Sequence, residues 1–330
     1  EQWRLIKAGG AGTKAGHTLS ELAMEFLQLA QIKEVTRRDY ANKIKADILP
    51  FFGAETDLKS LEWDNGGREQ VMRLKKLIDA RGSKEHANRV LIVLRGMFGL
   101  AINDLRWMRG ENPALSSRFM RNRVETKGHP TIAFDELPEF IATLEEFDSS
   151  SLVKSALKLT LMTFVRAATM AQMQWDQLDF EEKLWTIPGD APGLKRVAGN
   201  TEEHIVPLTD GMIQLLTTIR SYNGDYKYVF HTRRQKKLPH MNPSSLNLMI
   251  KRMGDERYAG TCTAHGLRAL VTTSGLERLG FPYEVIDALL GHTGKDKVRK
   301  AYDRTTWLTQ RREFLEAWEG ELVKCGLRFD

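Results

Sequence analysis

Four residues in the carboxyl-terminal third of the sequence could act together on a phosphate ester. His265 and Arg268 lie three residues apart in TAHGLRAL, so a helix there would place both side chains on one face. His292 follows a glycine at the end of an apolar run, and Tyr302 lies ten residues later in the basic stretch VRKAYDR. A guanidinium can bind two phosphate oxygens, and an imidazole can donate a hydrogen bond or move a proton near neutral pH. A tyrosine, whose ordinary pKa is about 10, needs a proton acceptor or a positive neighbourhood to act as a nucleophile.

Each of these residues also has an ordinary structural interpretation when it is taken alone. A His–Arg pair at this spacing is typical of a solvated helix face, His292 could cap a helix, and Tyr302 could pack against a core. Cys262 and His265 have a spacing that metal ligands use, and His292 could join them. No second close pair and no carboxylate cluster accompanies them in the sequence, so we expect neither a zinc site nor a cofactor.

The conjunction of HGLR, then LGH, then a tyrosine in VRKAYDR resembles the tyrosine recombinase (phage integrase) family, most of all the integrases of satellite phages and genomic islands. That family has an earlier arginine at the end of an apolar helix, which here is Arg166 in LTLMTFVRAATM. It also has a lysine between two strands, and Lys195 lies between LWTIP and HIVPL, next to Arg196. Three residues after the first arginine the family often has an acidic residue, whereas this chain has Thr169.

The resemblance implies a site-specific DNA recombinase that integrates or excises a mobile element through a covalent 3′-phosphotyrosine, without metal or ATP. Tyr302 would be the nucleophile, and the general acid would be Lys195 or a neighbouring basic residue. The whole phosphate site would comprise Arg166, Lys195, His265, Arg268 and His292. The implied partners are the double-stranded DNA of an attachment-site core, further copies of the chain in a homo-tetramer held by the C-terminal helix, and accessory DNA-bending or directionality proteins. The implied location is the bacterial cytoplasm, at the nucleoid when the protein is bound to DNA.

Two other functions fit the same residues. A type IB topoisomerase resembles recombinases at the catalytic set and would relax supercoils without a defined site. A DNA-binding regulator could keep the fold without cutting, and it would bind its site tightly without forming a covalent product.

Length and composition agree with a DNA-processing enzyme but do not establish one. A chain of 330 residues exceeds the usual size of a single core, so we expect two domains. The net charge of +6 makes a polyanionic partner plausible, and two cysteines point to reduced thiols in the cytosol rather than a disulfide framework.

No apolar run approaches the ~18 residues of a membrane span, and no secretion signal is seen. The start at Glu1 without methionine suggests a fragment, from which an arm-binding domain of the related integrases would be missing.

Hydrophobic periodicity predicts a mainly α protein with a small antiparallel β-sheet, in two lobes. We expect a linker or tail at residues 1–16, an all-helical core-binding (DNA-binding) domain at 17–115, a basic linker at 116–130 and a mixed α+β catalytic domain at 131–330. Helices are expected from Thr18, with Glu21 completing a capping box, from Thr36, and at 68–80, 84–105, 135–144, 151–173, 244–253, 264–279, 282–290 and 297–323. Strands are expected at 184–188, 204–208 and 227–231.

The first lobe and the linker carry basic and amide side chains that could lie along a phosphate backbone. The candidates are Arg37, Arg38, Lys43, Lys84, Asn88, Arg89, Arg121 and Arg123. Near the carboxyl terminus, an apolar stripe from Trp307 to Leu322 recurs at helical spacing. We expect this stripe to belong to the intramolecular core, and the resemblance gives docking onto a neighbouring protomer as the alternative.

Overall fold

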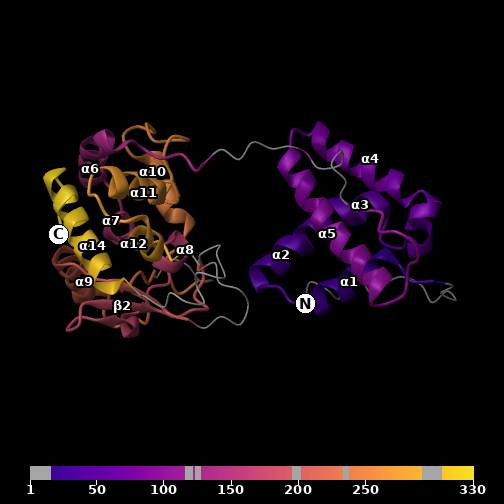
Figure 1. Ribbon diagram of the computed structural model, residues 1–330, viewed down its shortest axis with the longest axis horizontal. Coiled ribbons are helices and arrows are strands. Elements are labelled where there is room, and N and C mark those ends of the chain that lie inside the picture. Colours follow the sequence, from indigo (N-terminus) through magenta and orange to yellow (C-terminus); the bar gives the residue numbers. More distant parts are fainter. Residues whose placement is uncertain (1–15, 116–121, 123–127, 195–201, 233–237, 292–306) are drawn as a thin grey trace. The chain divides into compact units, whose positions relative to one another are not determined.

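The structure is a computed structural model that describes residues 16–115, 122, 128–194, 202–232, 238–291 and 307–330. The chain divides into two compact units, Glu1–Thr126 and Lys127–Asp330, and the division falls within the basic segment 116–130 (Figure 1). Each unit has its own core of buried apolar side chains. Of the residues assigned a role from the sequence, Lys195, His292, Tyr302, Arg121 and Arg123 lie outside the described residues.

The described part of the first unit contains helices and the loops between them, and no strand. Its helices are α1 (Leu19–Leu29), α2 (Glu34–Lys43), a π-helical turn (Ile44–Ile48), α3 (Leu49–Phe52), two 3₁₀ turns (Leu58–Leu61 and Trp63–Asn65), α4 (Gly67–Ala80) and α5 (Lys84–Asn103). The longest, α5, packs against α1, α2 and α4 and buries Leu94 and Phe98 completely, so it forms the centre of this unit.

The helix starts of this unit test the capping predictions. The capping box at Thr18 is confirmed, because its hydroxyl accepts from the Glu21 N–H and its own N–H donates to the Glu21 carboxylate. The predicted start at Thr36 is wrong, because Lys33 is the N-cap residue in extended conformation and Thr36 lies inside α2. The Lys33 carbonyl already accepts the Arg37 N–H, so the first helical hydrogen bond forms without a side-chain cap.

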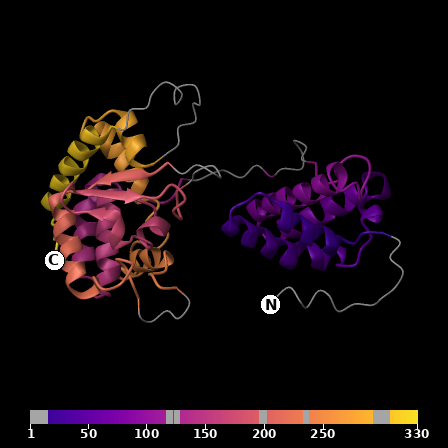
Figure 2. The same cartoon turned by 90° about the horizontal axis from the view of Figure 1, so that it is seen from below.

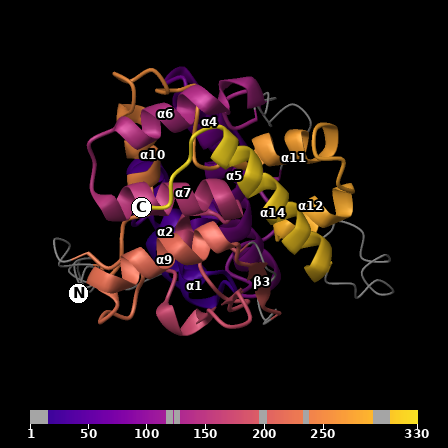
Figure 3. The same cartoon turned by 90° about the vertical axis from the view of Figure 1, so that its left-hand side faces the viewer.

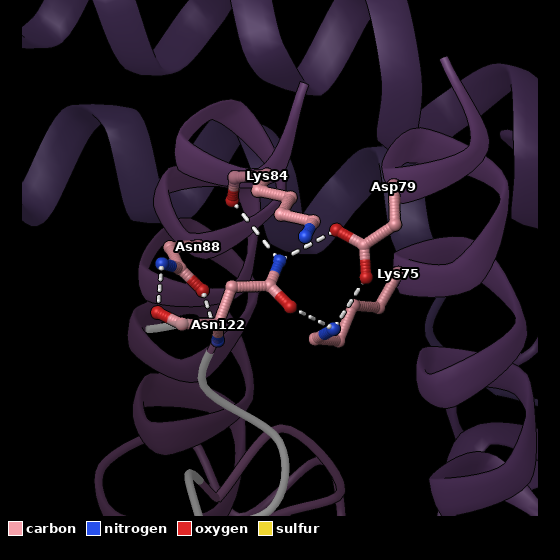
Figure 4. Close-up of polar contacts among 5 residues, drawn as sticks. All are labelled: Lys75, Asp79, Lys84, Asn88 and Asn122. Carbon is pink, nitrogen blue, oxygen red and sulfur yellow. Dashed lines mark hydrogen bonds and ion pairs between the residues drawn. The ribbon is translucent and has the colours of Figure 1, made fainter. Parts of the chain in front are cut away.

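Asn122 fixes the point at which the chain leaves the first unit (Figure 4). Its backbone N–H and carbonyl both pair with the side-chain amide of Asn88, each at 3.0 Å. Its own amide accepts from Lys75 Nζ at 2.8 Å and donates to Asp79 Oδ1 at 2.5 Å and to the Lys84 carbonyl at 3.2 Å. The backbone of Asn122 is therefore bound by α5, and its side chain is bound by both α4 and α5.

The second unit combines helices with a three-stranded sheet. After a 3₁₀ turn (Phe134–Glu136) come α6 (Leu137–Glu146), α7 (Ser151–Thr163), α8 (Ala167–Met170), a 3₁₀ turn (Trp175–Gln177), β1 (Leu178–Asp179), β2 (Leu184–Ile187), β3 (His204–Pro207), α9 (Asp210–Asn223), α10 (Ser244–Arg252), α11 (Leu267–Glu277), α12 (Tyr283–Leu289) and α14 (Leu308–Lys324). The strands pair antiparallel in the order β1-β2-β3, with Trp185 opposite Val206. Figure 2 shows strands of this sheet as arrows within the second unit. The predicted fold class, mainly α with a small antiparallel sheet, is confirmed.

Helix α7 runs through the middle of this unit and packs against α8, α9, α10 and α14 (Figure 3). The apolar stripe of α14 lies in the same core, where Trp318 is fully buried and its Nε1 donates to the Leu161 carbonyl at 3.0 Å. The described part of the stripe is intramolecular, as predicted. Among the residues that the structure describes, no helix is long and apolar enough to cross a bilayer.

Two predicted elements of this unit are wrong. The single helix over 151–173 ends at Thr163, and Phe164 adopts a left-handed conformation (φ 56°, ψ 17°) before α8 begins. The predicted strand at 227–231 forms only two isolated bridges, from Tyr228 to Gln174 and from His231 to His240. The two residues that follow Tyr228 pair with different segments. The Val229 N–H donates to the Met173 carbonyl, whereas the Phe230 carbonyl accepts from the Met241 N–H, so no ladder of strand pairing forms. The third strand is instead the two-residue β1.

Candidate active site

Arg166 lies at the break between α7 and α8, where it is the extended N-cap residue of α8. The left-handed Phe164 turns the chain out of α7, and this exposes the arginine rather than continuing an apolar helix. The side chain is half-buried, and its Nε is buried without a hydrogen-bond partner among the described residues. Burial lowers the pKa of Arg166 below its ordinary value. A partly desolvated guanidinium with an unpaired donor is suited to accept an anionic ligand.

Arg268 lies in the first turn of α11 and is only 6% exposed. Its Nη1 donates to the Phe164 carbonyl, and its Nη2 donates to the Leu290 carbonyl at 2.7 Å. One guanidinium therefore ties the turn that carries Arg166 to the end of α12. Burial, and secondly the positive charge of Arg166, lower the pKa of Arg268 to about 9. The two arginines thus share one partly desolvated region whose excess positive charge an anion would relieve.

The His265 ring lies one turn before Arg268 and is partly exposed. It meets the ring of His129 edge-on, with centroids 4.3 Å apart. The segment that carries His129 is held against this turn, because the Pro130 carbonyl accepts the Thr263 N–H at 3.1 Å. A β-carbon at Gly266 would lie 1.8 Å from that carbonyl oxygen, so the glycine of HGLR is required by close packing.

The end of α12 is fixed on two sides immediately before His292. The Leu290 carbonyl receives Arg268, and Gly291 has a left-handed φ of +62°. A β-carbon at Gly291 would lie 3.2 Å from Cε1 of His204, a buried residue at the start of β3. His204 and His129 were not predicted as neighbours of the site, because no spacing in the sequence links them to it.

The described part of the chain does not hold a group of three or more His, Cys, Asp or Glu side chains placed to bind a metal ion. Cys262, the residue on which a zinc interpretation depends, is buried, and burial raises the pKa of its thiol to about 11. Since the thiolate is the metal ligand, this environment disfavours coordination by Cys262.

The basic residues predicted to grip DNA from the first unit differ in exposure. Lys84, Arg38 and Arg89 are exposed, although the two arginines pair with Glu34 and Glu85 on their own helices. Arg37 is partly exposed and donates to the Ala30 carbonyl at 3.0 Å. Two of the candidates offer little surface, since Lys43 is buried in an ion pair with Asp39 and Asn88 is occupied by Asn122.

The family model described as "Phage integrase family" matches residues 130–306, more than half of the chain. The chain belongs to the phage integrase family. It is 29% identical over 300 residues to prophage integrase IntA of Escherichia coli K12, covering 89% of this chain and 67% of that protein. It is 30% identical over 291 residues to the integrase of Shigella phage Sf6 (87% and 71%), and 28% identical over 279 residues to that of Enterobacteria phage P4 (82% and 61%). This integrase chain thus spans about two thirds of the length of these relatives.

Solved structures share the fold of this integrase. A lambda integrase fragment (residues 75–356), crystallised as a dimer on a COC′ core site, matches with a TM-score of 0.62 at 16% identity, covering 86% of this chain and 99% of that one. The Tn1549 transposon integrase (residues 82–397), solved with circular intermediate DNA, matches with a TM-score of 0.64 at 15% identity, covering 90% and 98%. The family match and the relatives identify a tyrosine site-specific recombinase, as predicted, and favour neither a type IB topoisomerase nor a non-cleaving regulator.

Proposed function

We propose that this integrase cuts and rejoins double-stranded DNA at a specific core site through a covalent phosphotyrosine on Tyr302. The observation that supports the proposal most directly is the Arg268 guanidinium, bound to the Phe164 and Leu290 carbonyls. These contacts bring the Arg166 turn, the HGLR turn and the residues just before His292 to one place, in the combination that phosphate chemistry requires.

The phosphate is held by Arg166 and Arg268. Attack on a phosphodiester builds negative charge on its non-bridging oxygens, and fixed cations stabilise that charge without reorganising. Arg268 is held by two backbone carbonyls before any ligand arrives, and a guanidinium has further N–H donors to give. His265 and His292 supply additional donors or a proton acceptor beside this clamp.

The proposed reaction conserves the energy of the phosphodiester. The Tyr302 oxygen attacks phosphorus and gives its proton to a histidine, the bond from phosphorus to the 5′ oxygen breaks, and that oxygen takes a proton from the ammonium of Lys195. The product is a 3′-phosphotyrosine and a free 5′ hydroxyl. Attack of a 5′ hydroxyl on the same phosphorus reverses these steps and reseals the strand, so neither ATP nor a metal ion is consumed.

The partner in the cell would be attachment-site DNA at the bacterial nucleoid, with the first unit and the segment 116–130 adding affinity through their basic side chains. Lambda integrase has been solved as a dimer on a core site and as a tetramer on a Holliday junction, and we extend that assembly to this chain as part of the proposal. Because the described apolar stripe of α14 is buried in its own unit, a contact made by this helix would use its exposed face, which carries Gln310, Glu313, Glu316 and Val323.

Covalent trapping tests the proposal. The intact chain and its Tyr302→Phe variant are incubated with a nicked duplex that carries the attachment core of the element, with and without chelator. An adduct that resists the chelator and is absent from the variant is expected. Tight binding of the same DNA without any adduct would instead support a protein that binds and does not cut.

A further inference from the structure

Thr169 lies where many family members have an acidic residue, and its hydroxyl makes a contact that a carboxylate could not make. The residue is on α8, three positions after Arg166, and is 3% exposed. Its Oγ1 donates to the Pro192 carbonyl at 2.6 Å. Pro192 belongs to the connection from β2 to β3, the segment that contains Lys195. An ionised carboxylate only accepts hydrogen bonds, so an acidic residue here would face this carbonyl without a bond to offer.

The chain next to this contact is packed tightly onto α8. Gly193 has a left-handed φ of +91°, and a β-carbon there would lie 2.5 Å from Thr169 Oγ1 and 3.1 Å from the Thr169 backbone nitrogen. Glycine is therefore needed both for its conformation and for the close approach. The following residue, Leu194, is 5% exposed in the core of the unit, and its N–H donates to the Ala191 carbonyl at 3.2 Å.

The described contacts of this connection reach Leu194, the residue directly before Lys195. Leu194 follows Pro192 and Gly193, which lie against the same short helix whose N-cap residue is Arg166. A lysine has a long flexible side chain, so the position of its ammonium depends on where its own backbone is held.

We propose that Thr169 is a positioning residue for the proton transfer to the leaving 5′ oxygen. It anchors the base of the β2–β3 connection to α8, so that the ammonium of Lys195 and the guanidinium of Arg166 address the same phosphate. The inference rests on the proposed role of Lys195 as general acid. It goes beyond that role because it explains how a chain with threonine at this position holds the lysine in place.

The test uses two nicked substrates that differ only in the leaving atom. One carries the natural 5′ oxygen at the cleavage site, and the other carries sulfur as the bridging atom. A thiol has a pKa of about 8.5, so the sulfur leaves as thiolate without needing a general acid. Adduct formation by the intact chain is measured on both substrates for Thr169→Val, which keeps the shape and loses the hydroxyl, and for Thr169→Ser, which keeps the hydroxyl.

We expect Thr169→Val to slow cleavage of the oxygen substrate about tenfold or more, with less than about a twofold change on the sulfur substrate. Thr169→Ser is expected to stay near the original rate on both. Gly193→Ala, which would push the connection away from α8, is expected to show the same selective loss as Thr169→Val. An equal loss on both substrates, or no loss, overturns the inference, because it would mean that Thr169 acts through the fold or through Arg166, or does nothing.

Lys195→Ala on the same two substrates separates the inference from the function on which it rests. A selective loss on the oxygen substrate supports Lys195 as general acid, and the result for Thr169→Val then decides the inference alone. An equal loss on both substrates for Lys195→Ala would reject the proposed role of Lys195, and the inference would fall with it.

Discussion

Replacing Trp318 by alanine tests whether the stripe of α14 belongs to the core of its own unit. The indole is fully buried, its ring centroid is 5.4 Å from that of Phe164, and its Nε1 is bonded to the Leu161 carbonyl. Truncating a buried tryptophan to alanine costs about 3–5 kcal/mol through lost contacts and the cavity left behind. The loss also leaves the Leu161 carbonyl without its indole donor. Trp318→Ala should therefore destabilise the second unit by roughly that amount in the free protein.

Hydrogen exchange measures this change in each unit separately, which matters because a chain of two units need not unfold in one step. A loss of about 3–5 kcal/mol corresponds to roughly a hundred- to several-thousandfold faster exchange of the most protected amides in α7, at about 1.4 kcal/mol for each factor of ten. The amides of α5 serve as an internal reference, since the first unit has a separate core. Val323→Ala is the matched control on α14, because Val323 is 47% exposed and its truncation should change stability by no more than about 0.5 kcal/mol.

Two results would refute this reasoning. Unchanged exchange in α7 of Trp318→Ala would mean that the indole does not support the core of its own unit. Protection of α7 in the original protein that falls on dilution would mean that a second copy supplies the contact. In the second case the alternative of docking onto a neighbouring protomer would replace the intramolecular packing.

Three shorter predictions concern the arginine site and the chain leaving the first unit. Arg268→Lys should reduce adduct formation at least about a hundredfold with less than about a threefold change in DNA binding. The reason is that one ammonium cannot reproduce the planar fork that joins Phe164 to Leu290. A loss of DNA affinity in a gel-shift assay as large as the loss of adduct formation would contradict this prediction. Because the pKa of Arg268 in the free protein is about 9, the free site carries this charge below that pH and loses it above it. Adduct formation on the sulfur substrate, measured below saturating DNA so that the rate reports the free protein, should therefore fall as the pH rises through 9, and a rate that stays flat to about pH 10.5 would show that this charge is not needed. Asn122→Asp would set a second carboxylate against that of Asp79 and repel it. Protease cleavage within residues 116–127, followed by mass spectrometry, should therefore become about ten- to a hundredfold faster. An unchanged cleavage rate would mean that the contacts of Asn122 do not hold this segment against the first unit.

Local patterns in the sequence predicted what depends on neighbouring residues. The capping box at Thr18, the helices α4, α5 and α10, and the strands β2 and β3 are close to the predicted ranges. The break at Phe164 could not be predicted, because the run LTLMTFV is apolar and helical in pattern, and nothing local requires the chain to turn. What completes the turn is the hydrogen bond from Arg268, a residue about a hundred positions away in sequence. Tertiary contacts of this kind override local propensity.

The same distinction applies to the site. Arg166, His265 and Arg268 could be assigned by resemblance because their types and order are distinctive, whereas Thr169 only registered as a departure from the family pattern. Its partner, the Pro192 carbonyl, is a backbone atom and leaves no trace in a sequence. The contact of His204 with Gly291 is hidden for a similar reason, since it depends on the packing of β3 against the end of α12.

The way Arg268 is held connects the stability of the fold to its chemistry. Burying a guanidinium is unfavourable, and a second guanidinium beside it adds to the cost. The lowered pKa of Arg166 expresses the cost of burial, and the lowered pKa of Arg268 expresses both. The two carbonyl contacts offset part of it, but they come from the turn at Phe164 and the end of α12, so the charge is tolerated only if both are in place. A bound phosphate would lower the remaining cost, and by linkage its binding should stabilise both turns at once. Binding of DNA at this site would therefore stabilise the Phe164 turn before Arg166 and the end of α12 before His292 together, which couples recognition of the phosphate to the placement of the groups that act on it.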